Sequence, residues 1–385
     1  MRATPSPSYC STSNIMEVAY IGIKGLPPKG GAERVVEAIV KRMPAYGINT
    51  TVYCDMRYTP VGYSLDGSKL VRLPSVHNKY LRMTILDLLA ALHAVTFGNY
   101  DLIHLHHREA SFVLPILRLR YRIISTSHGA AYWRTKWGPL AKNILRLMDI
   151  PFITLSNVAT SVSEQDSREL DQEFDRRIRY IPNGVDLSII PDQEQARLVL
   201  KQHDLEPGKY LIFVAGRIVP TKGAHLAIDA VNQMPSNTPL LIVGDDDHVP
   251  EYSQNLRQMA GPRVKFQPLI ENPDILFGLM MDAQCLVFPS LVEAMSMVLL
   301  EAASINVPIV CSDIPENRKI LHDEAVYFQS DNVQDLVNQL EWVTNHPNET
   351  SQLSQRARDS VNSEFSWDSI ASRYADLYQE VMNTP

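Results

Sequence analysis

Two glutamates lie eight positions apart in the apolar segment EAMSMVLLEAAS, which runs from Glu293 to Ser304. On a helix, eight positions correspond to about 800°, so the two carboxylates would lie roughly 80° apart and could face one side. The preceding QCLVFPSLV is typical of a buried strand that ends in a turn. A carboxylate pair where a strand gives way to a helix could hold the hydroxyls of a polyhydroxy ligand. The alternative is an exposed loop Glu and a helical Glu with no shared role.

A second group of residues could bind an anion. Gly30 and Gly31 precede a helical pattern, where free backbone N–H groups and the helix dipole favour phosphate. Their spacing is not G-x-G-x-x-G, so a dinucleotide fingerprint is not predicted. Arg217 and Lys222 lie in a loop that follows a predicted strand, and two cations there suit a diphosphate. The structural alternatives are a glycine-rich turn and two solvated cations.

Several histidines lie at the ends of predicted strands. His128 follows RIISTS, and this position suits a catalytic role as well as a structural one. His104, His106 and His107 in HLHHRE resemble a metal cluster. At strand spacing His104 and His106 share a face and His107 does not. We therefore interpret this segment as a strand end near a cleft.

Strands alternate with helices along the chain in two series. The first comprises the strands MEVAYIGI, NTTVYC, DLIHLHH, RIISTSH, FITLS, ATSVSE and RYIPNGVD, with the helix AERVVEAIVKRM after the first strand. The second opens at KYLIFVAGRI and continues through LLIVGDD, VKFQPLI, CLVFPS, PIVCSD and AVYFQ. This alternation predicts an α/β fold with two Rossmann-like domains of parallel strands, divided near Val185. Ligands bind beyond the carboxyl ends of such strands, where the candidate residues lie.

The composition is that of a globular protein without a membrane span. The chain has 385 residues, of which 45% are hydrophobic and 21% charged. It contains no run of about 18 apolar residues. Residues 1–14 are rich in Ser, Thr and Pro, and we interpret them as a disordered tail, with Met16 as a candidate start. The four scattered cysteines form no C-x-x-C pair, and no secretory signal is present, which predicts a cytoplasmic protein without disulfides or zinc.

The charge is unevenly distributed. Through Val185 the chain carries 23 Lys and Arg against 15 Asp and Glu, a net charge of +8, and from Asp186 onward it carries 13 against 28, a net charge of −15. A basic first half indicates an anionic partner, and no nucleic-acid-binding motif is present. We therefore predict contact with an anionic membrane surface or a lipid-linked substrate, the alternative being a solvated face. The clustered cations are Arg118, Arg120, Arg122, Arg134, Lys136, Lys142 and Arg146.

The motifs form a recognisable series when they are taken together. G-x-x-G-x-P-x-x-x-G-G-A-E-R, S-H-G, I-P-N-G-V-D, G-R-x-x-x-x-K-G and E-x7-E follow one another in this order. In this the chain resembles the retaining glycosyltransferases of family four, which have the GT-B fold, over Ile15 to Met382. HGAAYWRTKWG is further similar to a bacterial branch that builds surface polysaccharides. The resemblance implies an acceptor domain over 15–185, completed by a C-terminal helix over 366–385, and a nucleotide-sugar donor domain over 186–365.

The resemblance also implies a role for each candidate residue. Glu301 would hold the ribose hydroxyls, whereas Glu293 and His128 would face the donor sugar. The diphosphate would lie against Arg217, Lys222 and the glycine pair. The implied substrate-binding residues are therefore Gly30, Gly31, Arg217, Lys222, Met295, Ser296, Met297, Val298 and Glu301.

The implied reaction is transfer of a hexose from a UDP- or GDP-linked donor to a hydroxyl acceptor, such as a lipid-linked or growing polysaccharide. It would retain the anomeric configuration by front-face displacement, without a metal or other cofactor. Asp245 and Asp247 form a D-x-D pattern that binds metal in another glycosyltransferase fold, but here we interpret it as a solvated loop. The usual E-G-F-G of the resembled family is E-A-M-S in this chain, and Pro268 stands where glycine is frequent. The sequence therefore does not predict which donor sugar is used. The alternatives are a nucleotide-sugar epimerase and a non-catalytic relative.

Overall fold

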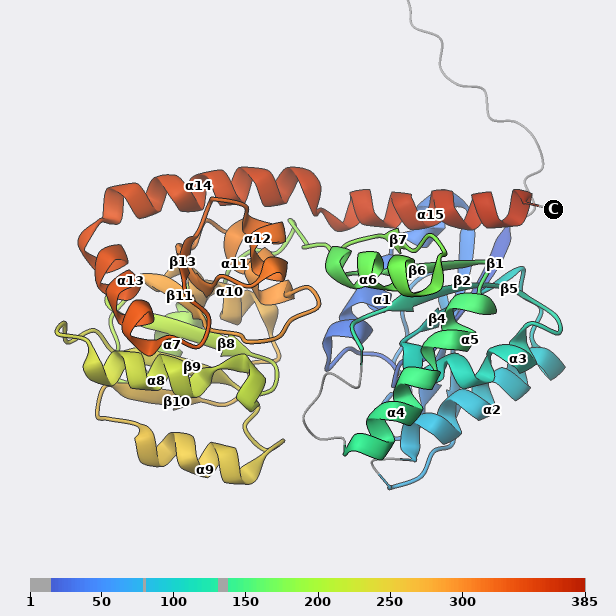
Figure 1. The fold of residues 1–385 in the computed structure, drawn as a ribbon, viewed down its shortest axis with the longest axis horizontal. Helices are drawn as coiled ribbons and strands as arrows, with labels where there is room; N and C mark the ends of the chain where they lie inside the picture. The colour runs from blue at the N-terminus through green and yellow to red at the C-terminus, as the bar shows by residue number, and fades with distance from the viewer. Residues whose placement is uncertain (1–14, 79–80, 131–137, 385) are drawn as a thin grey trace, which may run out of the picture.

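The computed structural model describes residues 15–78, 81–130 and 138–384, and it contains two α/β units that lie side by side (Figure 1). The first unit is built on a sheet of order β3-β2-β1-β4-β5-β6-β7, and the second on a sheet of order β10-β9-β8-β11-β12-β13. Every strand pair in both sheets is parallel. The predicted fold class, two Rossmann-like domains, is confirmed.

The first sheet is made of short strands whose side chains are largely buried on both faces, as expected when helices cover both sides of a parallel sheet. Its strands are β1 (Met16–Ile21), β2 (Ile48–Asp55), β3 (Ser68–Leu73), β4 (Leu102–His106), β5 (Arg122–Ser127), β6 (Val158–Ser161) and β7 (Arg179–Tyr180). The helices of this unit are α1 (Gly31–Val40), α2 (Arg82–Phe97), α3 (Leu114–Leu117), α4 (Pro139–Leu147), α5 (Asp149–Thr154) and α6 (Glu164–Phe174).

The second sheet repeats this plan with a continuous apolar core. Its strands are β8 (Leu211–Ala215), β9 (Leu240–Gly244), β10 (Val264–Gln267), β11 (Cys285–Phe288), β12 (Ile309–Ser312) and β13 (Val326–Phe328). Its helices are α7 (Gln193–Gln202), α8 (Ala224–Gln233), α9 (Pro250–Met259), α10 (Pro273–Met281), α11 (Met297–Ser304), α12 (Pro315–Leu321), α13 (Val333–Asn345) and α14 (Pro347–Glu364).

Two details of the sequence-based prediction are wrong. FITLS was predicted to be a strand, but residues 149–154 form helix α5. Asp149, in the first turn of this helix, is buried and forms an ion pair with Arg108 at 3.1 Å, so tertiary contacts decide the conformation of a run too short to show a period. Strand β3 was not predicted, because its partly exposed SKLVRL carries no continuous apolar run.

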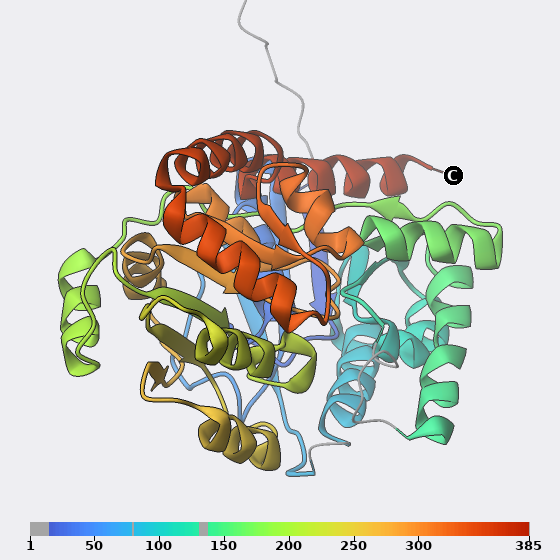
Figure 2. The ribbon, with the colours of Figure 1, turned by 60° about the vertical axis from the view of Figure 1, so that its left-hand side comes forward.

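The chain crosses back to the first domain at its C-terminal end. Helix α14 leaves the second domain and α15 (Trp367–Asn383) continues along the same edge of the molecule, over the first sheet (Figures 1 and 2). Trp367, Ile370, Tyr374 and Tyr378 of α15 belong to one apolar cluster with Tyr20 of β1 and much of α1. Helix α15 is therefore part of the first domain's core.

Each sheet reverses its strand order at one point, between β1 and β4 in the first and between β8 and β11 in the second. In open parallel sheets, ligands bind outside the carboxyl ends of the strands at such a reversal. The loops after β1 and β8 carry the glycine pair and the two cations, and the loop after β11 carries Glu293. His128 directly follows β5, next to β4.

Candidate functional site

Lys222 and Glu293, predicted separately, are brought into contact. Glycine at 223 permits this, because its φ is 72° and a Cβ there would lie 2.0 Å from the carbonyl oxygen of Pro289. The loop after β11 is further held by the Leu291 N–H, which donates to the carbonyl of Thr221 at 2.8 Å. Lys222 Nζ consequently lies 2.6 Å from Glu293 Oε1, and Ser290 donates its hydroxyl to the same oxygen at 2.6 Å.

Glu301 has a partner that the sequence reasoning missed. It lies on α11 with its side chain only 4% exposed, and Arg34 Nη2 of α1 is 2.7 Å from its Oε1. Burial raises the pKa of Glu301, and the charge of Arg34 opposes that rise. Within the described ranges, Glu301 Oε2 is buried and accepts no hydrogen bond. The motif GGAER contained the signal, but only its glycines had been assigned a role.

The segment 295–298 is shaped by hydrogen bonds within the protein. Ser296 is the N-cap of α11, and its hydroxyl accepts from the Leu299 N–H at 3.3 Å. Ser296, which the resemblance aligns with a usual glycine, therefore has a local structural role. Met295 is tied to the connection between the domains, because Asn183 donates its N–H to Met295 Sδ at 3.0 Å and its side-chain amide to the Met295 carbonyl at 3.3 Å. The N–H groups of Met297 and Val298 open α11, in the turn that lacks intrahelical acceptors.

The glycine pair forms an uncapped helix start. Gly30 is the N-cap of α1 and makes no side-chain capping bond. A Cβ at Gly30 would lie 2.5 Å from Glu33 Oε2, whereas a Cβ at Gly31 would meet nothing within 4 Å. The space beside Gly31 is therefore open, whereas the Glu33 carboxylate of the first turn lies next to Gly30.

Arg217 lies exposed in the loop after β8, beside the D-x-D segment. Burial, and the charges of Arg217 and Lys24, lower the pKa of His248 against the opposing effect of Asp245. Asp245 accepts from the Asp247 N–H at 3.0 Å and pairs with His248 at 3.0 Å. Among the residues that the structure describes, no group of three or more His, Cys, Asp or Glu side chains is arranged to hold a metal ion.

His128 lies partly exposed after β5 and contacts a second histidine. Its Nε2 is 2.9 Å from Nδ1 of His106, and the two rings are stacked with centroids 5.2 Å apart. Burial, with a smaller effect from His107, lowers the pKa of His128 well below its ordinary value, so the ring is neutral at neutral pH. The HLHH segment was correctly placed at a strand end, but the contact with His128 was not predicted.

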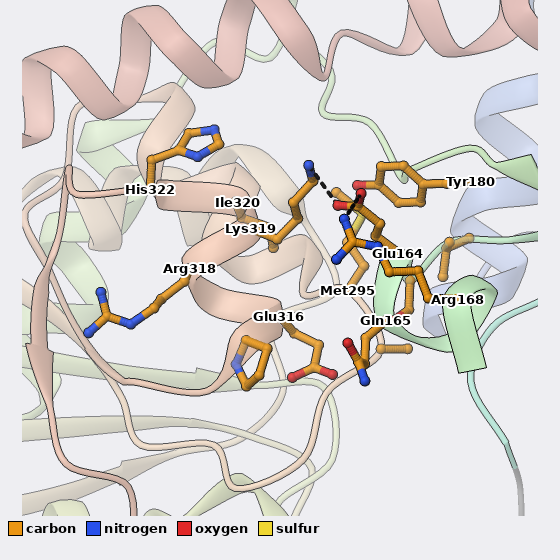
Figure 3. A pocket seen from close by; sticks show the side chains of 14 residues that line it. Glu164, Gln165, Arg168, Tyr180, Met295, Glu316, Arg318, Lys319, Ile320 and His322 are labelled. Carbon is orange, nitrogen blue, oxygen red and sulfur yellow. Dashed lines mark hydrogen bonds and ion pairs between the residues drawn. The ribbon is translucent and has the colours of Figure 1, made fainter. Parts of the chain in front are cut away.

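A cavity of about 410 Å³ lies between α6 and α12, next to the segment that carries Glu293 (Figure 3). Ala294 and Met295 form part of its wall, and an ion pair between Lys319 and Glu164 at 2.7 Å joins the two domains across it. Its polar lining carries both charges and includes Gln165, Arg168, Glu316 and Arg318. A polar space of this size, with charges of both signs in its wall, is large enough for a small polar ligand.

Two family models match the chain and together cover most of it: Glycosyltransferase Family 4 over residues 29–189, and Glycosyl transferases group 1 over residues 197–360. Among curated proteins, the chain is 21% identical to the UDP-Gal:alpha-D-GlcNAc-diphosphoundecaprenol alpha-1,3-galactosyltransferase of Escherichia coli, over 97% of this chain and 99% of that protein. It is 23% identical to the processive diacylglycerol alpha-glucosyltransferase of Acholeplasma laidlawii, over 56% of this chain and 67% of that protein.

The fold is also found in solved structures. Anabaena HepE in complex with UDP-glucose superimposes with a TM-score of 0.78 and 18% sequence identity, over 95% of this chain and all of that one. At this identity the likeness concerns the arrangement of the two domains.

Proposed function

Because this chain belongs to glycosyltransferase family 4 and has the GT-B fold, we propose that it transfers a hexose from a UDP-sugar to a hydroxyl of a lipid-linked glycan, with retention and without a metal. The observation that carries the proposal is the Lys222–Glu293 contact at the strand reversal of the second sheet. In the proposed site this contact would bring together a cation for phosphate and a carboxylate for sugar hydroxyls. The two curated relatives, one a UDP-Gal:alpha-D-GlcNAc-diphosphoundecaprenol galactosyltransferase and the other a diacylglycerol glucosyltransferase, support these substrate classes.

The proposed donor site uses both domains. Arg217, Lys222 and the open start of α1 at Gly31 would bind the diphosphate. Lys222 has three N–H donors, so it can keep Glu293 as a partner while it donates to a phosphate oxygen. Glu301 would accept from the ribose hydroxyls through Oε2, the oxygen that Arg34 leaves free.

In the proposed reaction, the bond between the anomeric carbon and the diphosphate oxygen breaks as the acceptor oxygen bonds to the same face of that carbon. The acceptor proton passes to the departing diphosphate oxygen. Positive groups at the diphosphate stabilise the charge that develops there. Glu293 is held at Oε1 by Lys222 and Ser290, which suits a group that binds and orients the sugar better than a covalent nucleophile.

We propose that helix α4 docks on the cytoplasmic face of an anionic membrane. No residue of this helix is buried, and Leu140, Ile144 and Leu147 are 76%, 53% and 57% exposed. Their spacing puts them on one face, and Lys142 adds positive charge to the same helix, whereas Arg146 pairs with Glu173 at 2.9 Å. In the described ranges no helix is both long and apolar enough to cross a bilayer.

The arginines that first suggested this contact have structural partners. Arg118 donates to the Asn157 side chain at 2.7 Å, Arg120 donates to the carbonyl of Val95 at 2.7 Å, and Arg122 donates to carbonyls at the end of α15. Arg134 and Lys136 lie outside the described residues. Charge reversal at 118–122 would therefore disturb the fold, and α4 is the better place for a test.

The deciding experiment incubates the protein with UDP-glucose, UDP-galactose, UDP-N-acetylglucosamine or GDP-mannose and a polyprenyl-diphosphate-linked sugar. We expect one UDP-sugar to be consumed, and the NMR coupling of the new anomeric proton to match that of the donor. Arg217→Ala and Lys222→Ala should each lower transfer at least about a hundredfold. Lys209→Ala, which removes an exposed cation paired with Glu206, is the matched control.

The two alternatives give different results in the same assay. An epimerase would convert the sugar without an acceptor, and a non-catalytic relative would bind a nucleotide-sugar without turnover. Transfer at nearly the parental rate in both cation variants would remove Arg217 and Lys222 from the site.

A further inference from the structure

The side chain of His106, the last residue of β4, is fully buried and has one hydrogen-bonding neighbour in the described part of the chain. Its Nδ1 lies 2.9 Å from His128 Nε2, while its own Nε2 is buried without a partner. Burial, followed by the neighbouring histidines 104, 128 and 107, lowers the pKa of His106 well below its ordinary value. Both rings are therefore neutral, and each carries a single N–H.

Only one combination of tautomers for His106 and His128 leaves no buried N–H group without an acceptor. If His128 donated from Nε2, His106 would have to carry its proton on Nε2, where a buried N–H would face no acceptor. Unpaired buried N–H groups are rarer and more costly than unpaired acceptors. His106 must therefore donate from Nδ1, and His128 then carries its own proton on Nδ1.

The orientation of His106 is set by the rings around it. Tyr20 stacks on it with centroids 5.9 Å apart, and His104 lies against it at 4.2 Å. His104 is itself fixed at both nitrogens, with Nδ1 2.7 Å from the Tyr378 hydroxyl and Nε2 2.7 Å from the Thr126 hydroxyl. The column of rings thus begins at Tyr378 on α15 and reaches His128 through His104 and His106.

The backbone at His106 is equally confined. Gly22, with φ of 102°, passes so close that a Cβ there would lie 1.9 Å from the carbonyl oxygen of His106. His106 therefore cannot shift along the strand without displacing the loop that follows β1.

We infer that His106 is a positioning residue, which holds His128 in the Nδ1–H tautomer and so makes His128 a hydrogen-bond donor toward the donor sugar. The inference rests on the proposed function, to which it adds the expectation from the sequence that His128 faces the donor sugar. A donor at this point can bind a sugar oxygen or the oxygen of the departing phosphate, whereas the other tautomer would present a base. His106 contributes to the reaction through His128 and touches no substrate.

The test compares His106→Asn with His106→Leu in the full-length protein. The amide N–H of Asn can replace the Nδ1–H donor, and Leu cannot. We expect His106→Leu to lower kcat roughly 10–100-fold, the order seen when a residue that orients a metal-bound histidine is removed. His106→Asn should recover most of this loss. The affinity for UDP, measured by calorimetry, should be unchanged in both variants, because the proposed nucleotide contacts lie elsewhere.

The tautomer is read directly from long-range ¹H–¹⁵N spectra of ¹⁵N-histidine-labelled protein, with the His128 signals assigned from their loss in His128→Gln. The parent should show the proton on Nδ1 of His128, and His106→Leu should show a mixture. A proton on Nε2 in the parent, or parental kcat in folded His106→Leu, would overturn the inference. Unchanged transfer in His128→Gln would instead refute the role proposed for His128, while the tautomer in the parent would still be as inferred.

Discussion

Arg34→Ala offers the sharpest test of how the two domains share the nucleotide. Arg34 Nη2 is 2.7 Å from Glu301 Oε1, and it is the neighbouring charge that opposes the effect of burial on Glu301. Without it, the pKa of Glu301 rises further, and a larger fraction of the carboxyl is protonated near neutral pH. A protonated carboxyl accepts fewer bonds from the ribose hydroxyls, so UDP should bind more weakly.

The expected loss of UDP affinity can be estimated from the solvent exposure of Arg34 and Glu301. A hydrogen bond to a charged group is worth about 1.5–3 kcal/mol. Arg34 is 36% exposed whereas Glu301 is 4% exposed, so solvent screening puts the binding energy lost when Glu301 is protonated at the lower end, about 1.5 kcal/mol. We therefore expect UDP to bind about tenfold more weakly to Arg34→Ala below the new pKa. The loss should shrink as the pH rises through that pKa, because Glu301 ionises again.

Calorimetric titration with UDP at pH 6, 7 and 8.5 measures the change in affinity and its pH dependence. Arg42→Ala is the control. Arg42 also forms ion pairs with residues distant in sequence, Asp368 at 2.6 Å and Asp186 at 3.8 Å, but it does not pair with Glu301. Affinity that matches the parent at all three pH values would refute the reasoning. Tighter binding would refute it too, and would mean that Arg34 occupies the place of the ribose.

Three further outcomes are expected. Sugar transfer should persist in EDTA, because Arg217, Lys222 and the start of α1 supply the positive charge at the diphosphate. Loss of activity on chelation, restored by manganese, would instead indicate that Asp245 and Asp247 are metal ligands. Leu140→Ser combined with Ile144→Ser should reduce co-sedimentation with anionic vesicles. Added salt should reduce it too, because it screens the charge of Lys142, which contributes about 1 kcal/mol at such a surface. Sedimentation that neither change affects would indicate a soluble acceptor. Gly223→Ala should lower the Tm more than Gly208→Ala. Both glycines have φ above 70°, but only a Cβ at position 223 would clash with Pro289. An equal fall in Tm, measured by calorimetry, would show that the loop at Pro289 moves to accommodate the methyl group at little cost.

The fold could be predicted because its signals are local and repeated. Buried strands such as β8 and β11 are continuous apolar runs, and the helices between them make the sheets parallel. The contact of Lys222 with Glu293 also follows from this pattern, because loops after neighbouring strands meet at one edge. Helix α5 was mistaken for a strand because the five residues of FITLS are too few to show a readable hydrophobic period.

The partners of the site residues could not be predicted in the same way. Arg34 and Glu301 come from different domains, so their pairing depends on how the two sheets face each other, which no local spacing encodes. His106 was noticed for its type and interpreted by its strand position alone. Its bond to His128 requires the parallel register of β4 with β5, which aligns His106 with Thr126.

Helix α15 has a consequence for how the protein is made. The first domain's core contains Trp367, Tyr374 and Tyr378, which a ribosome adds only after all the strands of the second domain. The segment that is synthesised first therefore cannot complete its own interior and must wait, with the apolar surface of β1 and α1 uncovered, while the later domain assembles. In this chain the usual vectorial order, in which an N-terminal domain folds before its successor, is reversed at the final step.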